Sequence, residues 1–257
     1  MLSYKRLPNY NSFGDVSIWE DKITYYLNKY PQGSNGWKLN RLYKLNGSNI
    51  VKAIGLDPKY SPEKLLTEMI YNHKISVGME IGESRGVLQE PIARKKYEEK
   101  FNVKIIEVGS ASLKNEPRYS SSTDGIIYEF INGEWIESDT IIEIKCPKKQ
   151  IYSIETHLKR IKNGYIQKKW HHNHIPIQHY VQMQMQMHIL NKKNCIFYVD
   201  PLEGKEYIEK IPYNKLFVDS KIMPKLNEFL TMMDQRIDEM VIEYEKNIMN
   251  YLDKATF

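Results

Sequence analysis

The stretch IIEIKCP at residues 141–147 places a carboxylate and an ammonium group inside an otherwise apolar segment. Its β-branched residues predict a strand, on which Glu143 and Lys145 share one face while Ile142 and Ile144 share the other. A Glu-x-Lys pair on a strand is also typical of a solvated charge pair. The apolar flanks favour a buried strand instead, and a buried charge requires a partner or a metal ion to offset its lost hydration.

A second carboxylate, Asp124, precedes Glu143 by 19 residues. It follows the polar run 120–123 and precedes Gly125, a pattern that predicts a turn between two extended pieces. Carboxylate oxygens are the ligands that Mg²⁺ and Mn²⁺ prefer, and metals held in this way can activate water for phosphodiester hydrolysis. Asp124, Glu143 and Lys145 are therefore candidates for a site that acts on phosphate esters.

Hydrophobic spacing outward from these residues predicts a mixed α/β or α+β domain. Proline at position 91 disfavours helical geometry at Glu90, so we expect a kink or a helix start there. Alternation at 180–188 suits a strand, but Gln and Met are good helix formers, and we predict a helix. The full expectation is helices at 16–27, 62–73, 84–101, 180–188 and 222–251, and strands at 103–108, 119–130 (broken at 124–125), 135–146, 195–200 and 207–213. We expect the first two helices to pack on the sheet.

Charge and composition fit a protein that meets a polyanion inside a cell. Lys and Arg outnumber Asp and Glu by 37 to 32, and seven of the basic residues lie at 148–169 beside the single acid Glu155. No apolar run is long enough to span a membrane, and the N-terminus lacks a secretory signal. We therefore expect a cytoplasmic or host-intracellular protein that is neither secreted nor bound to a membrane.

Two cysteines, Cys146 and Cys195, predict neither a disulfide framework nor a zinc site.

Five blocks in the chain resemble, in order, the PD-(D/E)XK nucleases, and within them the lambda exonuclease and YqaJ-like viral recombinase family. The resemblance covers about residues 37–201. It implies a restriction-endonuclease-like core in which helices flank a central mixed β-sheet. The blocks are Trp37-x-x-x-Arg41 with Gly47-Ser48, Gly86-x-x-x-Glu90-Pro91, Ser122-x-Asp124-Gly125, Ile142-Glu143-Ile144-Lys145-Cys146-Pro147, and Tyr180-x-Gln182-x-Gln184.

The resemblance assigns catalytic and metal-binding roles to matching positions. Asp124, Glu143 and the backbone carbonyl of Ile144 would bind a metal ion, Mg²⁺ with Mn²⁺ as a substitute, and Glu90 would contribute to that site. Lys145 would position the attacking water. Gln182 would hold that water or the phosphate, and its helix face continues through residues 178 and 186.

A second set of matching positions would bind the substrate end. Arg41, Ser48 and Ser122 would form a pocket for a terminal 5′-phosphate, with Ser48 at a helix N-terminus, and Trp37 belongs to the same substrate-binding set. Such a pocket would make the enzyme start from DNA ends.

The implied activity is a 5′ to 3′ exonuclease on linear duplex DNA, which leaves a single strand for recombination or repair. A homo-oligomeric ring and a single-strand annealing protein are the partners that the resemblance implies. Two alternatives stay open: an endonuclease of the same fold, and a catalytically inactive DNA-binding module. The intact Asp124, Glu143 and Lys145 argue against the second.

We predict a single domain over residues 1–257, with a helical extension at 1–36, a nuclease core at 37–212 and C-terminal helices at 213–257. The extension maps onto no part of the family pattern. The segment 157–174 interleaves basic residues with Tyr165 and Trp170, which suits contacts to phosphates and bases, although a solvated loop has the same composition. The spacing of its histidines fits no zinc motif, and the methionines at 183, 185, 187, 232 and 233 are predicted to fill the core.

Overall fold

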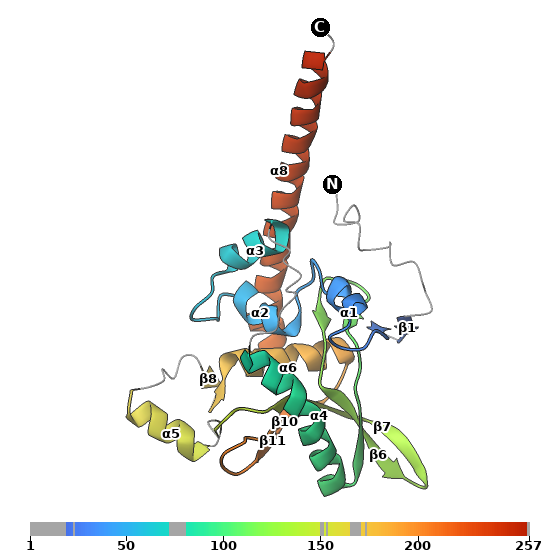
Figure 1. Ribbon diagram of the computed structural model, residues 1–257, viewed down its shortest axis with the longest axis vertical. Coiled ribbons are helices and arrows are strands. Elements are labelled where there is room, and N and C mark those ends of the chain that lie inside the picture. The colour runs from blue at the N-terminus through green and yellow to red at the C-terminus, as the bar shows by residue number, and fades with distance from the viewer. Residues whose placement is uncertain are drawn as a thin grey trace.

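The computed structural model describes residues 19–22, 24–71, 81–149, 152, 154–164, 171–172 and 174–255 (Figure 1). Its centre is a five-stranded sheet in the order β11-β10-β7-β6-β3. Strands β7 and β10 are parallel and the other neighbours are antiparallel, so the sheet is mixed. The bounds are β3 Val103–Ile106, β6 Gly125–Ile131, β7 Glu134–Lys145, β10 Asn194–Val199 and β11 Tyr207–Pro212.

These five strands confirm the predicted ones to within a few residues. The predicted break at 124–125 is also confirmed, because β5 (Ser120–Ser121) ends before it and β6 begins at Gly125. Gly125 allows a close strand approach: a Cβ atom there would lie 2.2 Å from Cγ2 of Ile105. The sequence feature that marks the turn therefore also allows β6 to pair with β3.

Each face of the sheet is covered by one helix, and β7 contributes alternate residues to each side. Ile142 and Ile144 pack with Ala93 and Tyr97 of α4 (Ile81–Phe101), as the alternation on this strand predicts. Ile141 belongs to the larger core on the opposite face, which includes α6 (Ile177–Leu190). Glu143 points with Ile141 toward α6, so the charged residue faces the larger core.

Helix α6 confirms the helical interpretation of the Gln/Met alternation. It follows Pro176 and ends at Asn191, which has a positive φ of 52°. Met183, Met185 and Met187 are fully buried, as predicted for core residues. Most of the helix is buried, which explains why it lacks a continuous polar stripe, and its buried glutamines must therefore find partners inside the protein.

The N-terminal region differs from the prediction. The expected helix at 16–27 is wrong, because β1 (Trp19–Asp21) and β2 (Tyr25–Asn28) are strands. With β4 (Ala111–Leu113) and β5 they form a second sheet in the order β1-β2-β4-β5. Aromatic and β-branched residues around position 25 favour a strand, and pairing with β4 overrides the local helical spacing. In the described part of the predicted extension, only Asn35 and Gly36 are helical, as the first two residues of α1 (Asn35–Asn40), and residues 1–18 and 23 lie outside the described part.

Helices α2 (Gly47–Ala53) and α3 (Pro62–Tyr71) follow. The predicted start of α3 is confirmed, since the Ser61 hydroxyl accepts a hydrogen bond from the backbone N–H of Lys64 at 3.2 Å. Helix α3 packs mainly on α2 and on the C-terminal helix rather than on the sheet, which corrects the expected packing.

Helix α4 passes through Pro91 without interruption, so a helix start at Glu90 is wrong. Its continuity places Arg94 one turn after Glu90. Beyond the sheet lie α5 (Ile154–Lys162) and the short pair β8 (His171–His172) and β9 (Ile175–Pro176).

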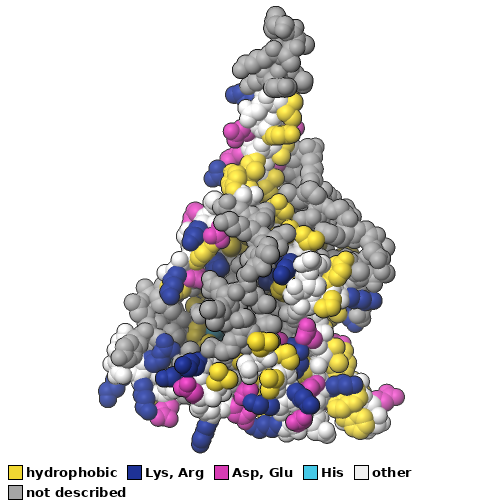
Figure 2. Space-filling view, viewed as in Figure 1, with side chains coloured by type: hydrophobic (Ala, Val, Ile, Leu, Met, Phe, Trp, Pro, Cys, Tyr) yellow, Lys and Arg dark blue, Asp and Glu magenta, His cyan; other side chains and the backbone are white. Residues whose placement is uncertain are grey.

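One long helix, α8 (Met223–Ala255), forms the C-terminal region after α7 (Lys215–Phe217) and one π-helical segment. Arg118 donates to Asp234 at 2.7 Å and Tyr119 donates to Asn227 at 2.6 Å, which anchors the first half of α8. Figure 1 shows its second half extending away from the sheet, and Figure 2 shows hydrophobic side chains along it. Ile242 and Tyr244, on this half of α8, are exposed.

No helix in the described residues is both long and apolar enough to cross a membrane.

Candidate active site

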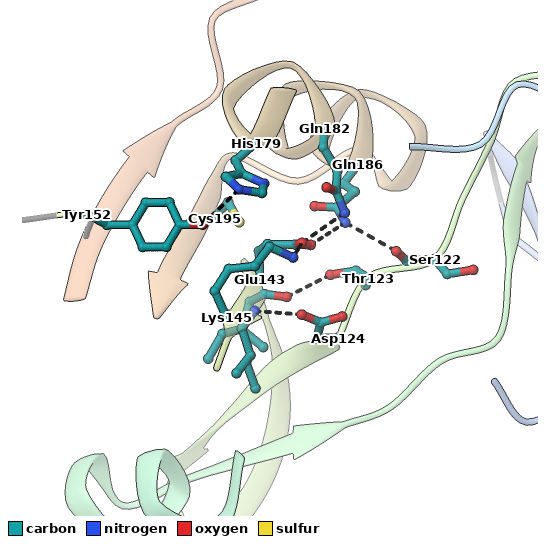
Figure 3. Close-up of polar contacts among 12 residues, drawn as sticks. Ser122, Thr123, Asp124, Glu143, Lys145, Tyr152, His179, Gln182, Gln186 and Cys195 are labelled. Carbon is teal, nitrogen blue, oxygen red and sulfur yellow. Dashed lines mark hydrogen bonds and ion pairs between the residues drawn. The ribbon is translucent and has the colours of Figure 1, made fainter. Parts of the chain in front are cut away.

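Four of the five predicted catalytic residues, all except Glu90, meet where two strands of the central sheet lie under α6 (Figure 3). Asp124 directly precedes β6, and Glu143 and Lys145 lie at the end of β7. Gln182 projects from α6 onto the same point. The structure thus brings together four residues that span 59 positions of the chain, from 124 to 182.

Glu143 is the centre of this group and is fully buried. One carboxylate oxygen, Oε1, accepts hydrogen bonds from the Lys145 ammonium and from Nε2 of Gln182, the latter at 2.8 Å. The other oxygen, Oε2, accepts from Nε2 of Gln186 at 2.7 Å. Three donors therefore offset the loss of hydration of one buried charge.

Asp124 is fixed by the backbone on either side of it. Its Oδ2 accepts from the backbone N–H of Ile144 at 2.6 Å, so it lies against the strand that carries Glu143. The preceding residue, Thr123, is fully buried and donates its hydroxyl to the carbonyl of Ile142 at 2.9 Å. These two contacts hold the Asp124 carboxylate next to Glu143 before any ligand binds.

The charges in the site are strongly coupled. Burial raises the pKa of Asp124 well above its ordinary value, and the neighbouring Glu143 raises it further. Burial lowers the pKa of Lys145, but the carboxylates of Glu143 and Asp124 outweigh burial and the net pKa is raised. Lys145 is therefore an ammonium donor, and the raised pKa of Asp124 means that a second negative charge beside Glu143 is unfavourable in this buried site.

Glu90 lies near this group but is engaged by another cation. Its Oε1 is 2.6 Å from a guanidinium nitrogen of Arg94, which also binds Glu107 at 2.8 Å. Burial raises the pKa of Glu90, and Arg94 and Lys145 oppose that effect. Glu90 thus contributes to the electrostatics of Asp124, although its carboxylate is paired with Arg94.

The donor set suits a hard divalent cation. Asp124 and Glu143 offer carboxylate oxygens, and a divalent cation relieves both the burial and the mutual repulsion that raise the pKa of Asp124. Across the described ranges, no three His, Cys, Asp or Glu side chains are grouped closely enough to hold a metal ion by themselves. The structure therefore presents two close carboxylates, with Glu90 near them but not joined to them.

A second polar group lies beside the first, around the hydroxyl of Ser122. Nε1 of Trp37 and a guanidinium nitrogen of Arg41 both donate to Ser122 Oγ, at 3.0 and 3.2 Å. The guanidinium of Arg41 also lies over the Trp37 ring, 4.3 Å from its centroid. Burial alone lowers the pKa of Arg41 to about 10, and no described carboxylate contributes to it. A half-buried cation whose described contacts are with the neutral side chains of Ser122 and Trp37 is suited to bind an anion.

Ser48 is only partly brought to this group. It lies exposed on the first turn of α2, as predicted, but no described hydrogen bond joins it to Arg41 or Ser122. Its neighbour Gly47 is close to the catalytic group, since a Cβ atom there would lie 3.2 Å from Cγ of Gln182. The N-terminus of α2 therefore packs on the site.

Sequence reasoning did not assign roles to Gln186, Thr123 and Arg94. The spacing of four residues from Gln182 was the available signal for Gln186, and the same spacing from Glu90 was the signal for Arg94. The predicted DNA-contacting residues Tyr165 and Trp170 lie outside the described residues, whereas α5 carries Lys159, Arg160 and Lys162 in its last turn.

A mixed sheet with an acid before one strand and a buried Glu-x-Lys at the end of the next defines a PD-(D/E)XK core. Residues 36–193 match the model of the YqaJ-like viral recombinase domain, and the chain belongs to that family. No curated protein sequence matches the chain.

Among solved structures, the chain is similar to an alkaline exonuclease (LHK-Exo) from Laribacter hongkongensis. The identity is 21% and the TM-score 0.62, over 83% of this chain and 99% of the other. The same enzyme in complex with dAMP gives 22% identity and a TM-score of 0.60, with the same coverage. These similarities establish that the fold is shared.

The pKa of Asp124 yields a prediction about stability. Because that pKa is raised in the folded protein, the free energy of unfolding decreases as pH rises from the ordinary carboxylate pKa through the raised value. Asp124→Asn keeps an acceptor for the Ile144 N–H and removes the buried charge. In EDTA at pH 8, we expect this variant to have a larger free energy of unfolding than the wild type, with a smaller difference at pH 5.

Urea unfolding at both pH values measures this difference. Asp139→Asn is the control, because hydrogen bonding to Lys193 lowers the pKa of this exposed carboxylate, and its removal should not stabilise the protein at pH 8. An Asp124→Asn protein less stable than the wild type at pH 8 would contradict the assigned electrostatics.

Proposed function

We propose that the chain is a metal-dependent DNA exonuclease that degrades one strand of linear duplex DNA from its 5′ end and leaves a single strand for recombination or repair. The observation that carries the proposal is the buried Glu143, held beside Asp124 and Lys145 at the ends of two strands. Membership of the YqaJ-like viral recombinase family and a fold shared with an alkaline exonuclease support the same activity.

Asp124, Glu143 and the carbonyl of Ile144 would hold the divalent cation, with Mg²⁺ the expected ion and Mn²⁺ its substitute. Glu90 would contribute through its charge, since Arg94 occupies its carboxylate. A cation held there supplies positive charge to the phosphate and makes bound water acidic enough to form hydroxide near neutral pH.

The protein's own residues orient the reactants. Lys145 carries a raised pKa, so it acts as a hydrogen-bond donor that can hold the attacking water or a phosphate oxygen in place. Gln182 packs against the N-terminus of α2 and donates to Glu143, which restricts its amide to the same small volume. Binding of the cation to Glu143 would free donors on both side chains for the substrate.

Recognition of an end would come from Trp37, Arg41 and Ser122. Ser122 Oγ accepts from both other residues, which leaves its own hydroxyl hydrogen free to donate to a phosphate oxygen. Arg41 offers further N–H groups and an unneutralised charge. This pocket lies two residues from Asp124 along the chain, so a bound terminal phosphate would place the next phosphodiester near the carboxylates.

Partners of the enzyme follow from the same proposal. Double-stranded DNA ends are the substrate, and basic residues of α5 would contact the backbone. The homo-oligomeric ring and the single-strand annealing partner need surfaces outside the active site. Exposed apolar side chains on α8 and at the tip of the β6–β7 hairpin, such as Tyr244 and Phe130, would be candidates for such surfaces.

End-labelled duplex DNA tests the activity directly. With Mg²⁺, we expect the 5′ label to be released early as mononucleotide from linear DNA, while a covalently closed circle of the same sequence stays intact. Cutting of the circle would favour the endonuclease alternative. An intact linear substrate with both Mg²⁺ and Mn²⁺ would favour the inactive binding module.

Lys145→Ala should lower turnover in that assay by a factor on the order of 10² or more, because a positioned donor is lost, while DNA binding is largely retained. Lys193→Ala is the matched control, since it removes an exposed Lys–Asp pair elsewhere on the protein. Equal turnover of the two variants would remove Lys145 from the mechanism.

Arg41→Ala should weaken action on 5′-phosphorylated ends selectively, by roughly 1.5–3 kcal/mol for a lost hydrogen bond from a charged group. The measurement compares kcat/KM on 5′-phosphate and 5′-hydroxyl duplexes. Arg236→Ala, on the exposed face of α8, controls for general loss of positive charge. An equal loss on both kinds of end would contradict the pocket.

A further inference from the structure

Gln186 is a buried polar residue to which neither the sequence pattern nor the proposed mechanism gives a role. It lies on α6 between Met185 and Met187, and its side chain is fully buried. Methionine at the neighbouring positions shows that this helix fills its surroundings with flexible apolar side chains. An amide at position 186 therefore calls for a reason specific to its contacts.

The contacts of Gln186 join the two parts of the site (Figure 3). Its Nε2 donates to Oε2 of Glu143 at 2.7 Å and to the backbone carbonyl of Ser122 at 3.2 Å. Both partners are oxygen acceptors, which fixes which end of the amide faces them. The amide NH₂ of Gln186 thus connects the Glu143 carboxylate to Ser122, whose hydroxyl accepts hydrogen bonds from Trp37 and Arg41.

The other end of the amide shows that this connection has a cost. Oε1 of Gln186 is buried and has no hydrogen-bond partner among the described residues. A buried acceptor without a partner destabilises the fold. Packing alone would therefore favour an apolar side chain at this position, and the requirement of Glu143 for a donor on Oε2 is what the amide satisfies.

We propose that Gln186 is a positioning residue that fixes the second oxygen of Glu143 and aligns it with the Ser122 phosphate pocket, so that a bound DNA end and the metal-binding carboxylate keep one geometry. The inference rests on the proposed function, because it assigns Glu143 to the metal and Ser122 to the phosphate. Lys145 and Gln182 both act on Oε1, which leaves Gln186 as the described side-chain donor that holds Oε2.

Gln184 provides a matched control on the same helix. It is also fully buried and also makes two hydrogen bonds, donating to the carbonyl of Pro212 at 2.9 Å and accepting from the N–H of Asn214 at 2.7 Å. These contacts face away from Glu143. Gln184→Met and Gln186→Met therefore remove the same chemical group from the same buried helix, and only the second removes a donor from Glu143.

Calorimetric titration of the full chain with Mn²⁺, without DNA, measures the first consequence. We expect Gln186→Met to raise the Mn²⁺ dissociation constant about 10- to 100-fold, the range for loss of a group that orients a metal ligand. Gln184→Met should bind Mn²⁺ as the wild type does. Equal dissociation constants for the two variants would overturn the proposal.

Kinetics on 5′-phosphorylated and 5′-hydroxyl duplexes measure the second consequence. In Gln186→Met, we expect kcat on the phosphorylated duplex to fall on the order of 10-fold or more, with KM nearly unchanged, because the pocket still binds the phosphate but no longer aligns it. The advantage of a 5′-phosphate in kcat should shrink, whereas its advantage in KM should remain. A parallel loss in KM, or a kcat like that of Gln184→Met, would refute the alignment.

A measurement on the wild-type protein tests the proposal even if neither variant folds. In ¹⁵N–¹H spectra, the side-chain amide of Gln186 should shift when Mg²⁺ is added and that of Gln184 should not; equal responses would again refute the proposal. Failure of the proposed function is distinct: a wild type that neither binds Mn²⁺ nor releases nucleotides would overturn both. A wild type that does both, with Gln186 indifferent, would overturn this inference alone.

Discussion

A charged carboxylate inside the protein, that of Glu143, is the constraint on which the site and much of the surrounding fold depend. It has no exposed surface, so its charge must be met by donors that are held in place. Lys145 comes from the same strand, and Gln182 and Gln186 come from α6, which must therefore lie across that face of the sheet. The hydrogen bonds that the buried Glu143 carboxylate requires thus constrain where α6 lies on the sheet.

Three consecutive residues before β6 each make a different contact in the site. The Ser122 hydroxyl accepts hydrogen bonds from Trp37 and Arg41. Thr123 donates a hydrogen bond to the backbone of β7, and the Asp124 carboxylate accepts one from it. Because these positions are covalently linked, the distance between the proposed phosphate pocket and the carboxylates cannot change much without moving the strand. Burial in this arrangement, together with the neighbouring Glu143, raises the pKa of Asp124, so the site lowers the stability of the metal-free protein and is suited to bind a cation.

The sequence predicted the parts of the molecule whose signals are local. The strand that carries Glu143, the turn at Asp124 and the capped start of α3 are set by neighbouring residues, and all three are confirmed. The helix prediction for the region around Tyr25 was wrong, because this segment forms a strand by pairing with β4, about 85 residues further along the chain. Helical spacing could show that Gln186 shares a face with Gln182, but the partners of that face depend on tertiary packing. The fold and the carboxylates were therefore accessible from sequence, whereas the hydrogen bonds that connect them were not.

Anomalous diffraction from crystals of the full chain soaked in Mn²⁺ tests the central claim most directly. The account predicts an anomalous peak between the carboxylates of Asp124 and Glu143, with the Lys145 ammonium displaced from Oε1 of Glu143. The carbonyl of Ile144 should lie within bonding distance of the ion. Mn²⁺ bound elsewhere, or no ion at this position while Lys145 still contacts Glu143, would contradict it and would identify the buried cluster as a structural charge network.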